Sequence, residues 1–151
     1  MVQEELMGTR AAVNGWFKMD DAPPRLIGTQ CLSCDSYYFP PQITSCHNPN
    51  CTTDAFKHVE LSRRGRLWSY TNACYQPPPP FISPTETFQP FAIAAVELDR
   101  EKMVILGQVT HSVEVEQLHV GMEMELIVET LFEDDDGPVV VYKWAPIPEK
   151  P

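Results

Sequence analysis

Four cysteines in the first third of the chain constrain its fold more than any other feature. Cys31 and Cys34 form a C-x2-C pair, and Cys46 and Cys51 form a C-x4-C pair after an eleven-residue loop. Two tight turns that face each other deliver four thiolates to a tetrahedral zinc, with Zn–S bonds of about 2.3 Å. We therefore predict one structural zinc per chain, which supplies folding energy that this proline-rich segment lacks.

The ligand set indicates a structural rather than a catalytic metal. Four thiolates complete the shell, whereas a catalytic zinc keeps one position open. His47 directly follows Cys46, and we expect it to be a loop residue or a donor outside the ligand shell. Asp35 follows the second cysteine at a turn position with positive φ, which aspartate tolerates at modest cost. The spacing alone leaves iron open as an alternative to zinc.

Composition and charge limit the location and the binding partners that the chain can have. The chain has 151 residues, five cysteines and a net charge of −10. It lacks a run of about 18 apolar residues, and its N-terminus is acidic, so we expect no membrane span and a reducing, cytoplasmic location. Nucleic-acid binding depends on phosphate neutralisation, which so acidic a chain opposes. We expect no nucleic-acid partner.

One basic cluster stands out against this charge. Arg63, Arg64 and Arg66 follow one another closely, just after Lys57 and His58. Two interpretations remain open: a solvated turn beside a strand, which is the commoner case, or a contact with a small anion or an acidic partner. The cluster is too small for general nucleic-acid binding.

The N-terminal segment carries helix-forming residues. Residues Gln3 to Phe17 place apolar side chains with partly helical spacing, and a breaker stretch with two prolines follows. We predict a short N-terminal helix with Asn14-Gly15 near its end. Trp16 and Phe17 are candidates for partner contact, with packing onto their own chain as the alternative.

The rest of the chain predicts a mainly β protein. Strands are expected in the metal lobe at Arg25–Gln30, Tyr37–Phe39 and Ala55–Leu61. Five more follow at Gly65–Tyr75, Phe91–Leu98, Met103–Val109, Met122–Phe132 and Val139–Trp144. The segment Ser112–Gly121 can hold a short helical turn, and five strands with that insertion match a small OB barrel. The expected parts are an N-terminal helix and linker (1–24), a zinc ribbon (25–61) and an OB-fold domain (62–151).

A proline-rich segment interrupts the barrel pattern. Gln76–Pro90 contains six prolines, which favour an extended conformation over a strand or helix. Phe81, Ile82 and Phe88 are apolar side chains within it. They either fold back on the barrel or form a docking arm for a partner.

Catalytic chemistry has little support in the chain. Cys74 is the one cysteine outside the cluster, and its histidine partners would have to be His111 or His119, in a different region of the sequence. We expect Cys74 to be a buried structural thiol. A stand-alone zinc enzyme is a further alternative, which the complete thiolate shell disfavours.

The order of several motifs resembles a known family. After the cysteine pairs come G-R-L-W-S-Y-T, Q-P-F-A-I-A-A-V-E-L-D, V-G-M-E-M-E-L and Y-K-W-A-P. Together they resemble the DUF35 family, whose members join a rubredoxin-like zinc ribbon to an acyl-CoA-associated OB fold. The resemblance covers Trp16 to Pro146.

The resemblance implies a non-catalytic accessory subunit of an acyl-CoA-processing complex. The partner it implies is a larger thiolase-fold catalytic subunit in a hetero-oligomer, foremost in a thiolase of the benzoylsuccinyl-CoA type. Complexes with a lipid-transfer-protein-type aldolase or a MaoC-type enoyl-CoA hydratase are alternatives. The subunit would stabilise its partner or shape the acyl-CoA entrance. The Arg63, Arg64 and Arg66 cluster would then be a possible contact for the phosphates of CoA.

Overall fold

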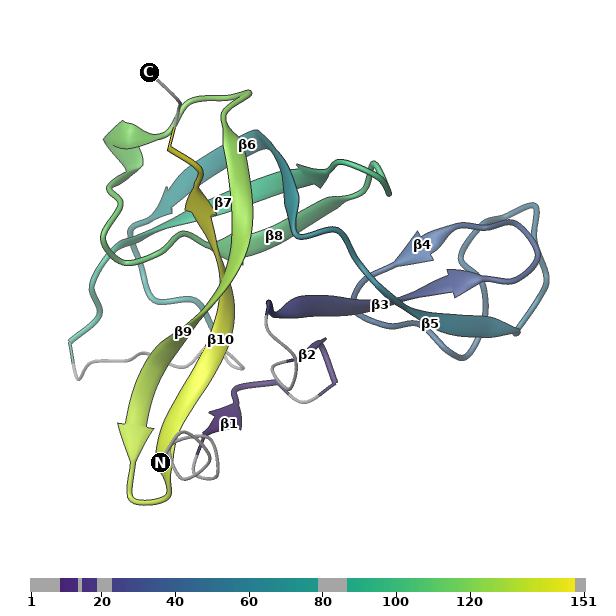
Figure 1. The fold of residues 1–151 in the computed structure, drawn as a ribbon, viewed down its shortest axis with the longest axis horizontal. Coiled ribbons are helices and arrows are strands. Elements are labelled where there is room, and N and C mark those ends of the chain that lie inside the picture. The colour runs from purple at the N-terminus through teal and green to yellow at the C-terminus, as the bar shows by residue number, and fades with distance from the viewer. Residues whose placement is uncertain (1–8, 14, 19–22, 79–86, 149–151) are drawn as a thin grey trace.

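The computed structural model describes residues 9–13, 15–18, 23–78 and 87–148. It is mainly β, with a ribbon sheet followed by a barrel sheet, as the sequence predicts (Figure 1). The strands are β1 Arg10–Ala11, β2 Phe17–Lys18, β3 Arg25–Cys31, β4 Tyr37–Tyr38, β5 Phe56–Glu60, β6 Arg64–Ala73, β7 Phe91–Leu98, β8 Val104–Gln108, β9 Glu123–Asp134 and β10 Gly137–Pro146. Within these residues, no helix is long and apolar enough to span a membrane.

The predicted N-terminal helix is wrong in the part that the structure describes. Strand β1 pairs in parallel with β10, and β2 pairs antiparallel with β3. Gly15 lies between them at φ +84°, a conformation that interrupts a helix. Free edges of both sheets offer this segment backbone partners instead. Ala12 N–H donates to Val140 O at 2.8 Å, and Ile27 N–H donates to Trp16 O at 2.8 Å. The stretch before Thr9 lies outside the described residues.

The barrel has the strand order β10-β9-β6-β7-β8 and closes between β8 and β10. Closure depends on one parallel bridge, Val109 with Trp144, rather than on a long ladder. Gly107 allows the close approach, because a Cβ there would lie 2.9 Å from the Trp144 ring. This is the five-stranded topology expected of an OB fold. The predicted helical turn is present as the short 3-10 helix η1, Val115–Gln117.

The barrel interior is filled by alternating side chains of its strands. Period-two alternation sends Leu67, Val96 and Ile105 inward, where they are buried. Met124, Leu126 and Trp144 complete the centre and are fully buried. Leu26 of β3 and Leu61 join the same core cluster, so the core continues into the base of the ribbon.

Backbone and side-chain contacts join the ribbon to the barrel. Arg63 donates from Nε to Pro24 O at 2.9 Å and from Nη2 to Leu126 O at 3.0 Å. Aromatic rings add a second contact, because Phe17 and Phe39 both pack edge-on against Tyr142. Figure 1 shows β3, β4 and β5 projecting from the barrel as a separate lobe.

Candidate metal centre and neighbouring surfaces

The four predicted ligand cysteines come together at the far end of the ribbon sheet. Their sulfur atoms all lie within 4.8 Å of one another. The shortest separations join Cys34 to Cys46 at 3.5 Å and Cys31 to Cys51 at 3.7 Å. A tetrahedron with Zn–S bonds of about 2.3 Å has sulfur–sulfur edges of about 3.8 Å. The cluster therefore has the donor atoms and the size that a tetrahedral zinc requires.

The first cysteine turn has the geometry of a metal-binding knuckle. The N–H groups of Ser33 and Cys34 point at Cys31 Sγ, at 3.4 and 3.5 Å. Asp35 has φ +63°, which confirms the predicted positive-φ position. Backbone donors to sulfur stabilise a thiolate, so these two N–H groups partly offset the effect of burial on Cys31.

The thiols of this turn differ in acidity. Burial raises the pKa of Cys31 to about 11. Contacts with the Ser36 side chain and backbone lower the pKa of Cys34 to about 6. Metal ligation requires thiolates, so binding at this cluster is coupled to proton release, and the buried Cys31 is one thiol that must lose its proton.

Tyr38 and His47 support the second cysteine pair from outside the cluster. The Tyr38 hydroxyl lies 3.0 Å from Cys46 Sγ and accepts the N–H of His47 at 3.0 Å. The His47 ring lies against Gln42 and edge-on to Tyr38, and it is not a member of the four-residue cluster. His47 is therefore a loop residue, and its backbone N–H reaches the ligand Cys46 only through the Tyr38 hydroxyl.

The candidate partner-binding residues lie in different environments. Phe17 is only 6% exposed and belongs to the core cluster, and Trp16 packs edge-on against Phe39. For these two residues the structure favours the alternative, packing onto their own chain. Phe88 is half-buried, with its ring 6.0 Å from that of Phe91. Phe81 and Ile82 lie outside the described residues, and partner contact by this set stays a prediction.

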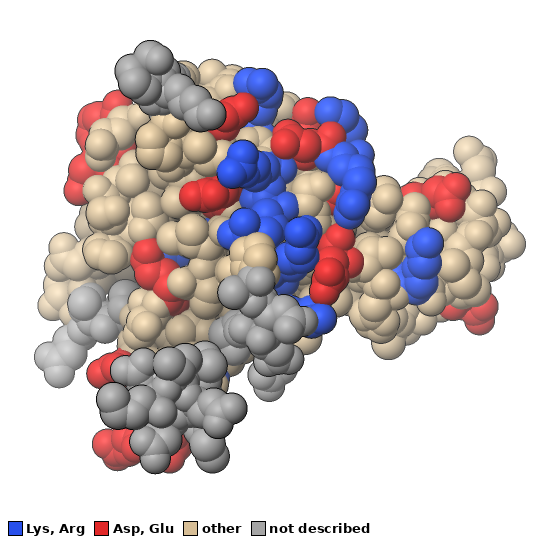
Figure 2. Space-filling view, viewed as in Figure 1, with Lys and Arg blue, Asp and Glu red and all other residues tan. Residues whose placement is uncertain are grey.

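The three arginines of the basic cluster do not act as one unit. Arg63 holds the junction described above. Arg66 donates to Gly121 O at 3.2 Å and lies 3.9 Å from the Glu123 carboxylate. Arg64 is exposed. Figure 2 shows basic side chains gathered where the barrel meets the ribbon. A phosphate contact stays a prediction, with Arg64 and Arg66 as its better-placed members.

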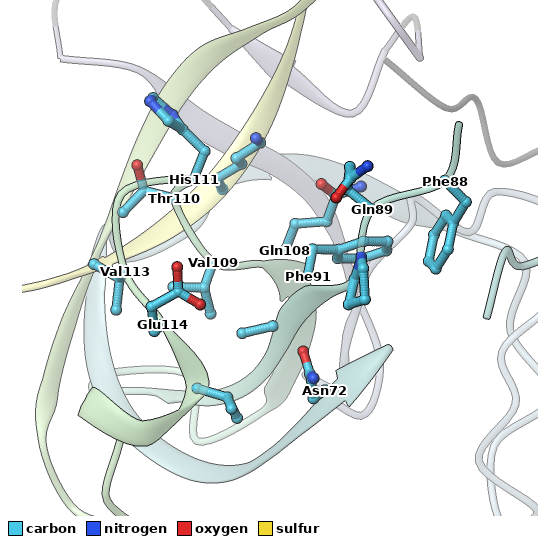
Figure 3. Close-up of a pocket in the computed structure, with 14 residues that line it drawn as sticks. Asn72, Phe88, Gln89, Phe91, Gln108, Val109, Thr110, His111, Val113 and Glu114 are labelled. Carbon is cyan, nitrogen blue, oxygen red and sulfur yellow. The ribbon is translucent and has the colours of Figure 1, made fainter. Parts of the chain in front are cut away.

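A cavity of about 240 Å³ lies at one end of the barrel. Figure 3 shows Phe88 and Phe91 on one side of it and Val113 and Thr110 on the other. The cavity is lined both by apolar side chains, such as that of Val109, and by polar ones, such as that of Asn72. The strand ends that form it lie far apart in sequence, so the pattern of residues contained no signal for this cavity.

A partly buried charge cluster borders the cavity. Lys143 Nζ lies 3.0 Å from Glu129 Oε1, and both Thr110 and His111 donate to the same carboxylate. Burial alone would raise the pKa of Glu129, but these donors outweigh it and lower the value to about 2. Glu129 is therefore ionised and pairs with the buried Lys143. Sequence reasoning missed this cluster, because Glu129 looks like one more exposed acid of a β strand.

Cys74 is exposed rather than buried, contrary to expectation. Among the described residues, its thiol has hydrogen-bond contacts only with Asn72. His111 instead contacts Glu129, and the backbone N–H of His119 contacts the Met122 sulfur. Neither histidine is placed as a base for this thiol.

Both parts of the chain match described protein families. Residues 21–56 match the rubredoxin-like zinc ribbon domain of ChsH2, and residues 58–129 match the C-terminal OB-fold domain of ChsH2. A DUF35 domain-containing scaffold protein of Methanocaldococcus jannaschii is 32% identical over 125 residues, which are 81% of this chain and 82% of that protein.

Two further comparisons name enzyme complexes. The benzoylsuccinyl-CoA thiolase subunit BbsA of Thauera aromatica is 30% identical over 129 residues, covering 85% of this chain and 81% of that subunit. A solved structure titled Ltp2-ChsH2(DUF35) aldolase aligns with a TM-score of 0.57 and 24% identity, over 81% of this chain and 84% of that one. The structural likeness supports the fold alone.

Proposed function

This chain belongs to the DUF35 family of zinc-ribbon OB-fold proteins, and from that premise we propose that it is a non-catalytic accessory subunit of an acyl-CoA-processing complex. The expected complex is a thiolase in which a larger, thiolase-fold subunit performs the chemistry. This chain would stabilise that subunit and shape its acyl-CoA site. The observation that carries the proposal is the 30% identity to a thiolase subunit over most of both chains.

The metal centre has a structural role in this proposal. One zinc per chain, held by Cys31, Cys34, Cys46 and Cys51, would take all four thiolates as ligands. A shell of this kind leaves no position for a substrate or an activated water. The zinc would therefore order the ribbon and leave the chemistry to the partner.

The placement of the remaining nucleophile also supports a non-catalytic role. Acyl transfer needs a thiolate next to a base and an oxyanion hole. In the described residues the hydrogen bonds of the Cys74 thiol go to Asn72 alone, and none joins it to a histidine or a carboxylate. A Cys74→Ala variant in a reconstituted complex should keep its turnover. A loss of several orders of magnitude with assembly intact would show that Cys74 is a nucleophile.

An aldolase complex is the second candidate, because both matching family models are named for ChsH2 and a solved structure is titled Ltp2-ChsH2(DUF35) aldolase. The two candidates differ in chemistry rather than in the role of this chain. A thiolase partner cleaves a 3-oxoacyl-CoA with free CoA, whereas an aldolase releases a carbonyl compound and needs no CoA as acceptor.

Co-expression with candidate catalytic chains tests the proposal. The chain should co-purify with a thiolase-fold protein, and the complex should turn over an acyl-CoA faster than the larger chain alone. Dependence of cleavage on added CoA would favour the thiolase over the aldolase. If this chain binds no thiolase-fold or aldolase chain, or if it turns over an acyl-CoA by itself, the accessory role is wrong.

A further inference from the structure

Four apolar side chains meet on the outer surface of strands β6, β7 and β8. Directly paired residues share one face of a sheet, and the register pairs Ala95 of β7 with both Ser69 and Leu106. The β-bulge at Trp68 and Ser69 adds the large indole to this row. Val104 lies two residues before Leu106 on the same face. We call Trp68, Ala95, Val104 and Leu106 the Trp68 face.

Three of the four side chains of the Trp68 face are open to solvent, and Ala95 between the strands is only 6% exposed. Trp68 is 61% exposed, Leu106 64% and Val104 38%. A fourth exposed apolar residue lies next to it, because Gly121 N–H donates to Leu67 O at 2.8 Å and brings the chain at Val120 beside Trp68. Single exposed apolar residues are ordinary, but several on one face of a sheet indicate an interaction surface.

The charges around the face are arranged as an interface rim. One row further along the strands, Arg66 pairs with Glu97 of β7 on one side and with Glu123 of β9 on the other. Val104 is the direct partner of Glu97, so it lies in this charged row at the edge of the face. The row of Trp68, Ala95 and Leu106 carries no charge. An apolar centre that contains an aromatic residue, with charged groups only at its edge, is the usual composition of a protein interface.

The charge of the whole chain opposes a second copy as the occupant. Two copies carry −10 each, and like charges at a shared interface cost binding energy. A different protein with a less acidic surface does not have this penalty. Resting on the proposed function, we propose that the Trp68 face binds the catalytic subunit, through a facing surface that is apolar at its centre and neutral to basic at its rim.

The test replaces one central side chain with a charge. Leu106→Lys puts an ammonium in the middle of the face and should weaken binding of the catalytic subunit about 100-fold or more. Because the side chain points outward, zinc content and thermal unfolding of the variant should match wild type. Trp68→Ala should weaken binding in the same direction without adding a charge.

Ile43→Lys is the matched control, because Ile43 is a branched aliphatic residue that is 63% exposed on the ribbon. It should change affinity less than about threefold. If wild type binds the catalytic subunit and Leu106→Lys binds equally well, the Trp68 face is not the interface, although the accessory function stands. If wild type dimerises and Leu106→Lys abolishes the dimer, the occupant is a second copy and the inference is wrong. If wild type binds no catalytic subunit, the proposed function fails and this inference with it.

Discussion

Between Cys31 and Glu60 the ribbon supplies none of the buried members of the core cluster, only Tyr37, Phe39 and Val59 at its margin. Strands β6 to β10, in contrast, supply most of that cluster. The barrel therefore gains its stability from apolar burial, and the ribbon must gain it from bonds between its cysteines and a metal. Two parts of one short chain thus depend on different physical forces, and each should respond to a different perturbation.

The largest effect should come from removing a ligand. Cys34→Ser leaves three thiolates, so zinc content should fall well below one per chain and ribbon amides should lose their protection in hydrogen exchange. Barrel amides should remain protected, because the barrel core does not use the metal. Wild type treated with a strong chelator should behave in the same way. Full zinc occupancy in Cys34→Ser would contradict the four-cysteine site.

The converse experiment removes part of the barrel core. Leu126→Ala truncates a fully buried side chain and should lower the free energy of unfolding by about 2–5 kcal/mol. Chemical denaturation measures that loss, and metal analysis should still find the zinc content of wild type. A loss of zinc from folded Leu126→Ala protein would mean that the two regions do not fold independently.

Removing the Arg63 hydrogen bonds tests how strongly the contact between ribbon and barrel stabilises the chain. Arg63→Met removes two charge-assisted hydrogen bonds to backbone carbonyls and should cost about 2 kcal/mol. The matched control is Arg64→Met, an exposed neighbour whose loss should change stability by less than about 0.5 kcal/mol. If the two variants lose the same free energy of unfolding in chemical denaturation, the Arg63 side chain does not stabilise the contact between ribbon and barrel.

Lowering the pH should reduce the stability of the barrel, because Glu129 becomes protonated. Its pKa is lowered to about 2 in the folded chain from an ordinary value of 4.5, so the folded state favours the ionised form. That stability is fully present above about pH 4.5 and is lost as the pH falls towards 2, an effect of about 1–2 kcal/mol after solvent screening. Glu129→Gln should therefore show a flatter decline of unfolding midpoint between pH 5 and 2 than Glu133→Gln, which changes an exposed acid near the end of the same strand.

The smallest effect concerns the first cysteine turn. Asp35 has φ +63°, where a β-branched side chain is strained, so Asp35→Val should lower ribbon stability by about 1 kcal/mol. Asp35→Gly should stay within about 0.5 kcal/mol of wild type, because glycine tolerates this conformation. Competition with a chromophoric chelator measures both. A valine variant that binds zinc as tightly as wild type would show that the turn is not strained.

Features with local causes could be predicted from the sequence. Alternating side chains identified β9, turn residues separated it from β10, and the cysteine spacing identified the four residues that cluster. The prediction for the N-terminal segment was wrong, because it considered the helix-forming residues but not the sheet edges with which β1 and β2 pair.

Features that depend on register between distant strands could not be predicted. Glu129 meets Lys143 and Thr110 only after β9 and β10 pair and the barrel closes. Strict alternation along the predicted strand Gly65–Tyr75 does not give the direction of Trp68, because a bulge shifts the register between Leu67 and Ser69. The bulge leaves Trp68 exposed on the outer surface, two strands away from Leu106. Tertiary context overrides local pattern at such positions.

Strand β3 starts at the barrel and ends at the metal, with Leu26 in the shared core and Cys31 in the cluster. Its length therefore sets the distance between the barrel and the metal site. Each residue adds about 3.3 Å, and successive side chains alternate faces. Adding one residue to β3 would turn Cys31 away from its three companions. Because β5 pairs with β3 from Ile27 to Cys31 and also returns to the barrel, moving the metal lobe outward by about 7 Å takes two added residues in each of these strands. The distance between barrel and metal site can thus change only in steps of two residues, made in both strands together.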